Sequence, residues 1–245
     1  QYNNSTSWDT TSVDKRYNFF YSMVEILSET KYIAPDKKED NIIATKVSGF
    51  KNPTFVTAMS EVQLSNFHTD NLMILDKEYL NPISGGCIAK YEYRLEDTIF
   101  QEIDTIYIIS FSPRKGRNFD ALKGVLYINS NGYAIQNVIA EPTGRQKLHL
   151  RIEQQYSFID GQNWFPTQLN FEIELSPRKK DTLTVQGKKY ISNINLNPKL
   201  KSKDFGLNKV TINDNAHLYD SIFWIQNRIQ PLSYKEKETY RIFDN

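Results

Sequence analysis

Two neighbouring segments, residues 148–158 and 165–175, alternate between apolar and polar side chains. In the first segment the apolar positions are Leu148, Leu150, Ile152, Tyr156 and Phe158. In the second segment one face carries Phe165, Thr167, Leu169, Phe171, Ile173 and Leu175. Successive side chains of a β-strand point to opposite faces, so each segment is predicted to be a strand with one buried face. The short Asp160-Gly161 turn between them requires antiparallel pairing.

A second hairpin precedes this one, with strands at Leu122–Asn129 and Tyr133–Ala140. Its turn contains Asn131-Gly132, a dipeptide that tolerates the positive φ angles of tight hairpins. From Cys87 to Leu175 the pattern predicts five consecutive strands joined by short turns. The predicted fold class is α+β and mostly β: a long antiparallel meander forming a curved sheet or half-barrel, with a few helices packed on one face.

Residues 14–33 fit two patterns. A helical stripe would contain Tyr17, Phe20, Tyr21, Val24 and Leu27, whereas strict alternation selects Phe19, Tyr21, Met23 and Leu27. We favour the strand, because a turn at residues 35–38 and a second apolar segment at 41–47 complete a hairpin. The helix remains the alternative.

Three segments carry helix signals. Asn52-Pro53 is typical of an N-cap followed by a first helical residue, which predicts a short helix to about Leu64. Asn213 or Asp214 is expected to begin a second helix, which Pro231 ends. Ser233 and Glu236 have the spacing of a capping box, which predicts a third helix over Tyr234–Phe243.

These elements suggest three parts of the chain: a flexible polar lead at 1–16, a sheet domain at 17–212 and a C-terminal helical segment at 213–245. The C-terminal segment is expected either to pack on the sheet or to lead away from it. A chain of 245 residues buries enough surface to fold without a metal or disulfide. Its single cysteine, Cys87, excludes an intramolecular disulfide and is predicted to be a small apolar side chain at a strand start.

Composition and motifs exclude several functions. With 30 basic and 29 acidic residues, the chain lacks the cationic excess of nucleic-acid-binding proteins. Phosphate-loop, dinucleotide and zinc patterns are absent, so no cofactor, metal site or catalytic residue is predicted. One group of carboxylates surrounds a predicted turn: Glu96, Asp97, Glu102 and Asp104. These are either solvated turn residues or, alternatively, a calcium site or the acid and base of an envelope glycan or peptide hydrolase.

Aromatic residues make up 13% of the chain and indicate a candidate site more clearly than the carboxylates do. Their plain role is core and cross-strand packing. Their functional role would be to line a concave sheet face that receives an apolar or sugar-like ligand. The predicted ligand-binding residues are Tyr91, Tyr93, Tyr107, Tyr133, Tyr156, Trp164 and Trp224.

Short motifs along the chain carry a resemblance to a known family. The longer ones are Lys46–Phe50, Leu95–Thr98, Gly124–Asn129, Tyr133–Asn137 and Trp164–Leu169. Near the C-terminus the resemblance rests on Phe223, Trp224, Arg228, Leu232, Glu236 and Tyr240. Together they resemble the central region of a large Gram-negative outer-membrane family of unknown function, in which a carboxypeptidase-regulatory-like domain comes first and an outer-membrane β-barrel is expected last.

The resemblance implies a periplasmic, outer-membrane-associated module, tethered through flanking domains outside this chain. It implies no catalytic residue, because the family has none established. A first residue of Gln rather than Met agrees with an excised segment or a removed leader. The one-sided meander with helices is also similar to the half-barrel of periplasmic lipoprotein carriers, in which acyl chains bind between sheet and helices.

These features favour a non-enzymatic periplasmic module that binds an apolar, lipid-like ligand or an envelope protein, without nucleic acid. A structural spacer between a regulatory domain and an outer-membrane barrel is the first alternative. The envelope hydrolase is the second. Fold alone does not choose among them, because one fold hosts many functions.

Overall fold

A computed structural model describes residues 2–11, 18–33, 37–49, 67–74, 77–116, 118–144, 148–178, 181–207 and 209–244. The chain divides into two compact units. Unit 1 comprises Gln1–Thr57 with Asp181–Asn245, and unit 2 comprises Ala58–Lys180. The boundaries predicted from the sequence fall after residues 16 and 212, whereas both ends of the chain belong to one unit in the structure.

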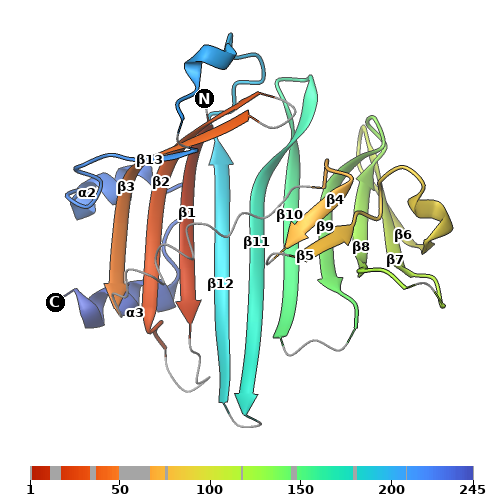
Figure 1. Ribbon diagram of the computed structural model, residues 1–245, viewed down its shortest axis with the longest axis horizontal. Coiled ribbons are helices and arrows are strands. Elements are labelled where there is room, and N and C mark those ends of the chain that lie inside the picture. Colours follow the sequence, from red (N-terminus) through yellow and green to blue (C-terminus); the bar gives the residue numbers. More distant parts are fainter. Residues whose placement is uncertain are drawn as a thin grey trace. The chain divides into compact units, whose positions relative to one another are not determined.

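Unit 1 contains a sheet with the strand order β13-β3-β2-β1-β12 (Figure 1). Its strands are β1 (Tyr2–Thr11), β2 (Ser22–Ile33), β3 (Lys37–Gly49), β12 (Asp181–Ser192) and β13 (Val210–Ile212). β13 runs parallel to β3, and the other neighbours are antiparallel. The predicted N-terminal hairpin is confirmed as β2–β3, and over Ser22–Ile33 the strand replaces the helical alternative.

The flexible lead expected at residues 1–16 is corrected over Tyr2–Thr11, which forms strand β1 between β2 and β12. The segment contains Thr6, Trp8 and Thr10, residue types that favour strands. Pairing on both edges gives its backbone N–H and C=O groups partners that a free lead would take from water. Polar composition therefore concealed a strand.

Two α-helices of unit 1 are described, α2 (Ser221–Asn227) and α3 (Tyr234–Phe243). α3 has the predicted bounds and capping box. α2 begins later than predicted, at an N-cap formed by Asp220, whose side chain accepts a hydrogen bond from the Phe223 N–H. The residues before it form turns instead, and the Ala216 carbonyl accepts a hydrogen bond from the Thr45 N–H of β3.

Unit 2 is a meander in which β6 to β11 are neighbours in sequence order, and this sheet is not closed into a barrel (Figure 1). Its strands are β6 (Tyr91–Phe100), β7 (Thr105–Pro113), β8 (Leu122–Asn129), β9 (Ala134–Pro142), β10 (Leu148–Ile159) and β11 (Asn163–Arg178). The five strands expected from Cys87 onward are six, because residues 91–113 form two strands around a turn. A 3-10 helix, η1 (Cys87–Ala89), precedes them.

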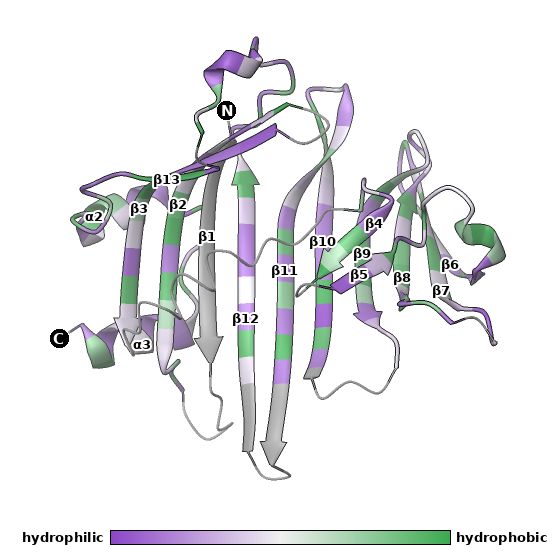
Figure 2. Ribbon diagram, viewed as in Figure 1, coloured by the Kyte–Doolittle hydropathy of each residue, from purple (hydrophilic) through white to green (hydrophobic). Residues whose placement is uncertain are grey.

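The predicted one-sided burial is confirmed in β10 and β11. Leu150, Ile152 and Tyr156 are buried on β10, as are Phe171 and Ile173 on β11. Figure 2 shows the alternation as bands of opposite hydropathy along both strands.

The prediction is wrong beyond the bulge at Gln155/Tyr156. There Phe165 pairs with Ser157 of the predicted polar face, and Pro166 is buried in place of Phe165 and Thr167, which are half-buried. Phe158 is 40% exposed, because it lies beside the turn that ends β10.

Both predicted hairpin turns exist, one of them in a shifted form. Asp160 and Gly161 have φ of 50° and 65° at the centre of a tight turn, which the Gln162 N–H closes by donating to the Ile159 carbonyl at 2.9 Å. In the other turn the positive φ angles belong to Gly132 and Tyr133, at 74° and 51°, and not to Asn131. Tyr133 therefore belongs to the turn, and β9 begins at Ala134.

The long irregular segment before η1 packs through its own apolar residues, as expected. It forms a small hairpin of β4 (Asn71–Ile74) and β5 (Lys77–Leu80). Leu72, Ile74 and Tyr79 are buried there. The helix predicted over residues 53–64 lies outside the described residues, as does Leu75.

Gly124 on β8 tests the close approach of β8 and β9. A Cβ atom at this position would lie 2.0 Å from the Ile139 carbonyl oxygen and 2.9 Å from the Ala140 Cα atom. We expect Gly124→Ala to lower the free energy of unfolding by about 3 kcal/mol or more, because backbone atoms must shift. Gly85, whose Cβ would meet no atom within 4 Å, provides the control. Denaturant unfolding should show Gly85→Ala within about 0.5 kcal/mol of the parent, and equal effects would contradict the register.

Candidate functional site

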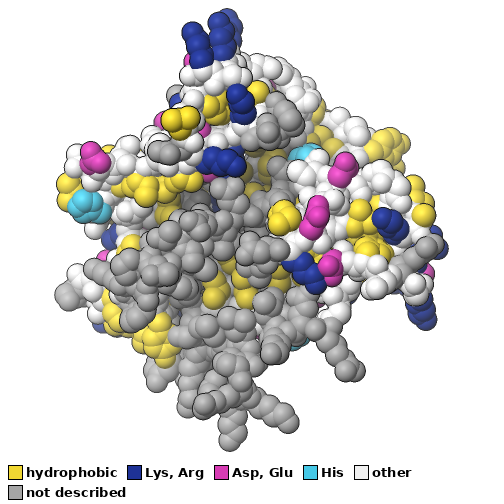
Figure 3. Space-filling view, viewed as in Figure 1, with side chains coloured by type: hydrophobic (Ala, Val, Ile, Leu, Met, Phe, Trp, Pro, Cys, Tyr) yellow, Lys and Arg dark blue, Asp and Glu magenta, His cyan; other side chains and the backbone are white. Residues whose placement is uncertain are grey.

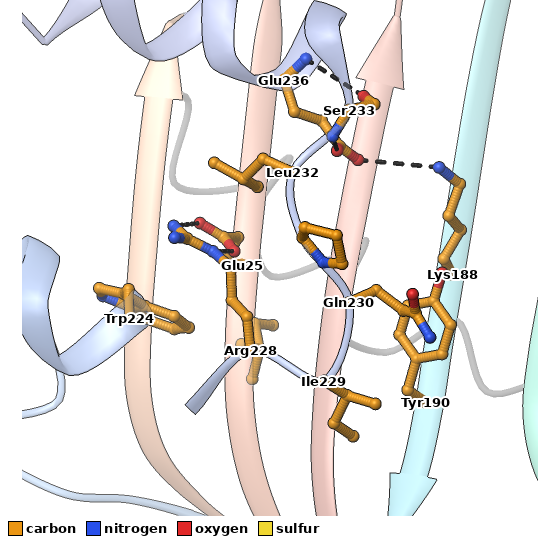
Figure 4. Close-up of a pocket in the computed structure, with 12 residues that line it drawn as sticks. Glu25, Lys188, Tyr190, Trp224, Arg228, Ile229, Gln230, Leu232, Ser233 and Glu236 are labelled. Carbon is orange, nitrogen blue, oxygen red and sulfur yellow. Dashed lines mark hydrogen bonds and ion pairs between the residues drawn. The ribbon is translucent and has the colours of Figure 1, made fainter. Parts of the chain in front are cut away.

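A pocket of 160 Å³ in unit 1 lies where the segment joining α2 to α3 crosses β2 and β12 (Figure 4). The polar residues that line it come from four elements: Glu25, Lys188, Tyr190, Arg228, Gln230, Ser233 and Glu236. Buried acidic and basic side chains in one pocket are unusual outside functional or structural ion pairs. The pocket therefore combines the buried charges that a binding or catalytic site would need.

Glu25 is the centre of the pocket. It lies on β2 and is 4% exposed. Arg228 binds it with two hydrogen bonds, Nε to Oε2 at 2.5 Å and Nη2 to Oε1 at 2.6 Å. The Tyr240 hydroxyl of α3 donates a third, short hydrogen bond to Oε1. A bidentate guanidinium–carboxylate pair is a strong, directional interaction, so one strand residue anchors both the end of α2 and the middle of α3.

Aromatic rings flank the guanidinium of Arg228. Its Cζ lies 5.9 Å from the Trp224 ring centroid and 5.8 Å from that of Tyr240. Burial opposes the charge on Arg228, but the hydrogen bonds and charge of Glu25 leave the pKa of Arg228 above its ordinary value. Burial, together with the charge of Glu25, raises the pKa of Tyr240. The phenol and the guanidinium therefore keep their protons at neutral pH.

A second carboxylate, Glu236, begins α3. Its side chain accepts a hydrogen bond from the Ser233 N–H at 2.5 Å, while the Ser233 hydroxyl accepts one from the Glu236 N–H at 3.4 Å. The other oxygen of Glu236 lies 3.7 Å from the Lys188 ammonium of β12. The capping box thus also ties α3 to the sheet.

The pocket unites residues that the sequence analysis noted singly. Trp224, Arg228, Leu232, Glu236 and Tyr240, which carried part of the resemblance, all line it or contact its central carboxylate. Trp224 is buried against Leu27 and Ala44.

The partner Glu25 was missed, although the sequence contains its signal. The alternation Phe19, Tyr21, Met23, Leu27 skips position 25, which places Glu25 on the buried face.

Glu25, Arg228 and Tyr240 form a structural cluster, which we call the lock, and do not have the arrangement of a reactive centre. Both oxygens of Glu25 already accept hydrogen bonds, so neither is free to remove a proton from a substrate. Within the described ranges, no group of three or more His, Cys, Asp or Glu side chains is placed to hold a metal ion. What the pocket does is hold α2 and α3 on the sheet.

A groove of 560 Å³ adjoins this pocket, lined by residues of α2, of α3 and of the segment that joins them. Its aliphatic lining residues are Ile225, Ile229, Pro231 and Leu232. Three cationic side chains also line it: Lys46, Arg228 and Lys237. Figure 3 shows hydrophobic side chains at the surface in the α2 region, at the left of the view. α2 is therefore apolar on its inner face, through Trp224, and on its outer face.

The seven predicted ligand-binding aromatics do not form one site. Trp224 belongs to unit 1 and the other six to unit 2. Tyr91 is buried near η1, and its hydroxyl donates to the Leu80 carbonyl at 2.8 Å. The neighbouring Tyr93 hydroxyl contacts the Pro82 carbonyl at 2.6 Å and the sulfur of Cys87 at 3.3 Å, and Cys87 is buried. These two tyrosines hold the segment before β6 in place.

The remaining four predicted ligand-binding aromatics fall into two groups. Tyr156 is buried, whereas Tyr107, Tyr133 and Trp164 lie near the turn between β8 and β9. The Tyr107 and Tyr133 rings stack with centroids 6.5 Å apart. The Trp164 indole N–H donates to the Asn131 carbonyl at 3.0 Å. This second group is exposed in part and lies at one end of the meander.

Tyr156 is the centre of a buried polar cluster. Its hydroxyl accepts a hydrogen bond from the Phe67 N–H at 2.9 Å and donates one to the fully buried Gln154 at 2.7 Å. His68 packs edge-on against its ring, and burial lowers the pKa of His68. The cluster fixes the start of the β4–β5 segment on β10.

The carboxylates around the β6–β7 turn do not converge in a cleft. Glu96, Asp97 and Glu102 are exposed and Asp104 is half-buried. Glu96 pairs with Arg94 at 2.7 Å and accepts a hydrogen bond from the Ser110 hydroxyl at 2.5 Å. The contacts of Ser110 and Arg94 lower the pKa of Glu96, so it stays ionised. Nothing among the described residues prepares this group as an acid and base pair.

Comparison with known protein families finds a match. It covers the meander of unit 2 and nearly all of strands β1 to β3 of unit 1. Residues 3–181 match the profile of a family of unknown function, DUF5686. The chain belongs to the DUF5686 family. No curated protein and no solved structure matches it. The DUF5686 match ends before α2 and α3, so the Arg228 and Tyr240 side of the lock lies beyond it. No helix that is described has the length and apolar character needed to cross a membrane.

The lock predicts asymmetric mutational effects. Arg228→Met leaves the buried Glu25 carboxylate without its cation and should lower the free energy of unfolding by about 3–5 kcal/mol. Adding Glu25→Leu removes that charge and should recover most of the loss. Arg241→Met, on the exposed face of α3, is the matched control and should change little. Denaturant unfolding of the parent and the three variants measures these differences. A double variant no more stable than Arg228→Met would contradict this role of the buried pair.

The polar cluster of unit 2 predicts a separate effect. Tyr156→Phe leaves the buried Phe67 N–H without its acceptor and should cost about 1–3 kcal/mol. Tyr107→Phe removes a half-buried hydroxyl for which no hydrogen bond to a described residue is found, and should change stability by less than about 0.5 kcal/mol. Thermal and denaturant unfolding measure both. A neutral Tyr156→Phe would mean that the cluster does not hold the β4–β5 segment.

Proposed function

We propose that this chain is a non-enzymatic periplasmic module of an outer-membrane-associated protein, and that unit 1 binds an apolar chain with an anionic head in the groove between α2 and α3. The outer-membrane setting, with a carboxypeptidase-regulatory-like domain before the module, comes from the sequence resemblance. The observation that carries the binding role is the unpartnered aliphatic face of α2.

Three aliphatic residues make this face, which we call the α2 stripe: Ile222 and Ile225 on α2, and Ile229 two residues after its end. All three are exposed, Ile225 by 71%. Three exposed aliphatic side chains on one short helix and its C-terminal end exceed the scattered apolar residues normal for a soluble surface. Removing them from water on binding supplies a driving force proportional to the area covered.

The charges around the groove favour an anionic head. Lys46 stands over the Tyr240 ring at 3.9 Å and lies 3.6 Å from Asp244, so it is only partly neutralised. Lys237 is exposed, and no described carboxylate pairs with it. An acyl chain ending in a carboxylate or phosphate would place its apolar part on the stripe and its charge beside these ammonium groups.

The lock in the neighbouring pocket supports binding without a change of fold. Glu25 holds Arg228 and Tyr240 on opposite sides of the α2–α3 connection, so both walls of the groove are fixed before a ligand arrives. A preformed site avoids the entropy cost of ordering its walls on binding.

The alternative function is a structural spacer between a regulatory domain and an outer-membrane barrel. It is favoured by the way hydrogen bonds occupy both the Glu25 and the Tyr156 clusters, which makes each unit rigid. A spacer would bind no amphiphile, so the same experiment separates the two functions. The hydrolase reading receives no support from the exposed carboxylates of the β6–β7 turn.

Titration of the chain with a fluorescent long-chain fatty acid tests the proposal. We expect saturable binding that Ile225→Ser with Ile229→Ser weakens about ten-fold or more, because two aliphatic contacts are lost. Lys46→Gln with Lys237→Gln should weaken the binding of the fatty acid but not that of the corresponding fatty alcohol, which carries no charge. Ile103→Ser, at an isoleucine of unit 2 that is 94% exposed, is the control. Absence of saturable binding, or equal binding by the stripe variant, would leave the spacer as the function.

A further inference from the structure

Three turns lie together at one end of the meander in unit 2. They follow β6, β8 and β10, and consecutive antiparallel strands bring alternate turns to the same end (Figure 1). We call residues 99–104, 130–133 and 158–162 the turn rim. It includes part of the aromatic group that the sequence analysis singled out, and the groove of unit 1 does not use it.

Hydrogen bonds join the three turns to one another. The Thr105 N–H donates to the Ser130 hydroxyl at 2.9 Å, and the Ser130 N–H donates to the Thr105 carbonyl at 2.8 Å. The Trp164 indole, beside the third turn, donates to the Asn131 carbonyl of the second. The turns therefore form one rigid surface and not three independent loops.

Large apolar side chains project from this rigid surface into water. Ile103 is 94% exposed, Phe100 81% and Tyr133 74%. Single exposed apolar residues need no explanation, but three on adjacent, cross-linked turns form a patch. Tyr133 also holds a left-handed φ of 51°, which bulky residues rarely adopt. Strained backbone of this kind is concentrated at sites of binding or catalysis.

The charge of the rim has one sign. No Lys, Arg or His occurs in residues 95–113, 124–144 or 152–177, which contain all three turns and the adjoining strand halves. Carboxylates do occur there: Asp97, Glu102 and Asp160 are exposed. The rim therefore combines apolar contacts with a negative field that no cation of its own offsets.

We propose that the turn rim docks a partner protein whose contact surface is apolar at its centre and surrounded by Lys and Arg. The apolar tips supply the buried contact, and the carboxylates select a cationic border through charge complementarity. An anionic lipid surface does not fit, because the same carboxylates would be repelled from it. Rigid turns reduce the ordering cost of the contact. This surface is independent of the fatty-acid groove.

The test uses the whole chain and two designed amphipathic helical peptides, one of Leu and Lys and one of Leu and Glu, followed by fluorescence anisotropy. We expect the Leu/Lys peptide to bind more tightly, and its affinity to fall as salt rises. Phe100→Ser with Ile103→Ser should weaken its binding about ten-fold or more, and Glu102→Gln with Asp160→Asn should weaken it several-fold. These side chains are exposed, so the variants keep the fold, which circular dichroism checks.

Ile88→Ser with Leu207→Ser is the matched control, since it removes apolar side chains that are 73% and 104% exposed and belong neither to the turn rim nor to the groove of unit 1, and it should leave peptide binding unchanged. Equal binding of both peptides, or no loss in the Phe100/Ile103 variant, would overturn the proposal. Sedimentation with anionic or zwitterionic phospholipid vesicles is the third arm. Vesicle binding that depends on Phe100 and Ile103 would also overturn it, and would assign the rim to a membrane surface.

Discussion

Antiparallel pairing with a side-chain period of two determines most of unit 2. Because alternate residues of β10 and β11 face the same side, Ile152 and Phe171 meet across the pair while Arg151 and Glu172 meet on the opposite face. A slip of one residue would move every apolar side chain into water, so the pattern fixes the register as well as the fold. The same geometry sends alternate turns to one end, and the turn rim is a direct consequence.

Unit 1 depends on a different interaction. Glu25 is a charged residue at a buried position of β2, and it is tolerated there because Arg228 and Tyr240 satisfy both of its oxygens. A buried ion pair is weak evidence of stability, since an apolar replacement of equal volume is often as stable. Its effect here is orientation: α2 and α3 bind the sheet in one way, which leaves the aliphatic face of α2 outward.

Much of the architecture was predictable from local pattern. The alternation in residues 150–156 and 169–173, the Ser233–Glu236 capping box and the Asp160-Gly161 turn each depend on neighbouring residues, and each was confirmed. The bulge at Gln155/Tyr156, which moves Phe165 off the buried face, has no such local signal. β1 was not predicted, because its polar residues show no apolar period and its order comes from pairing with β2 and with β12, the second of which is distant in sequence. α2 begins later than predicted for a similar reason, since residues before it bond to β3. The lock joins residues 203 positions apart, and only the unexplained carboxylate in a buried alternation pointed to it.

The one-sided meander is the central claim, and thiol labelling tests it most directly. Single cysteines at Arg151, Ile152, Glu172 and Ile173, introduced in a Cys87→Ser background, report side-chain access at adjacent positions of two strands. We expect positions 151 and 172 to react with a polar maleimide at least about a hundredfold faster than 152 and 173, which require opening of the sheet to react. Equal rates at adjacent positions, or the opposite order, would contradict the fold of unit 2 and the turn rim built on it.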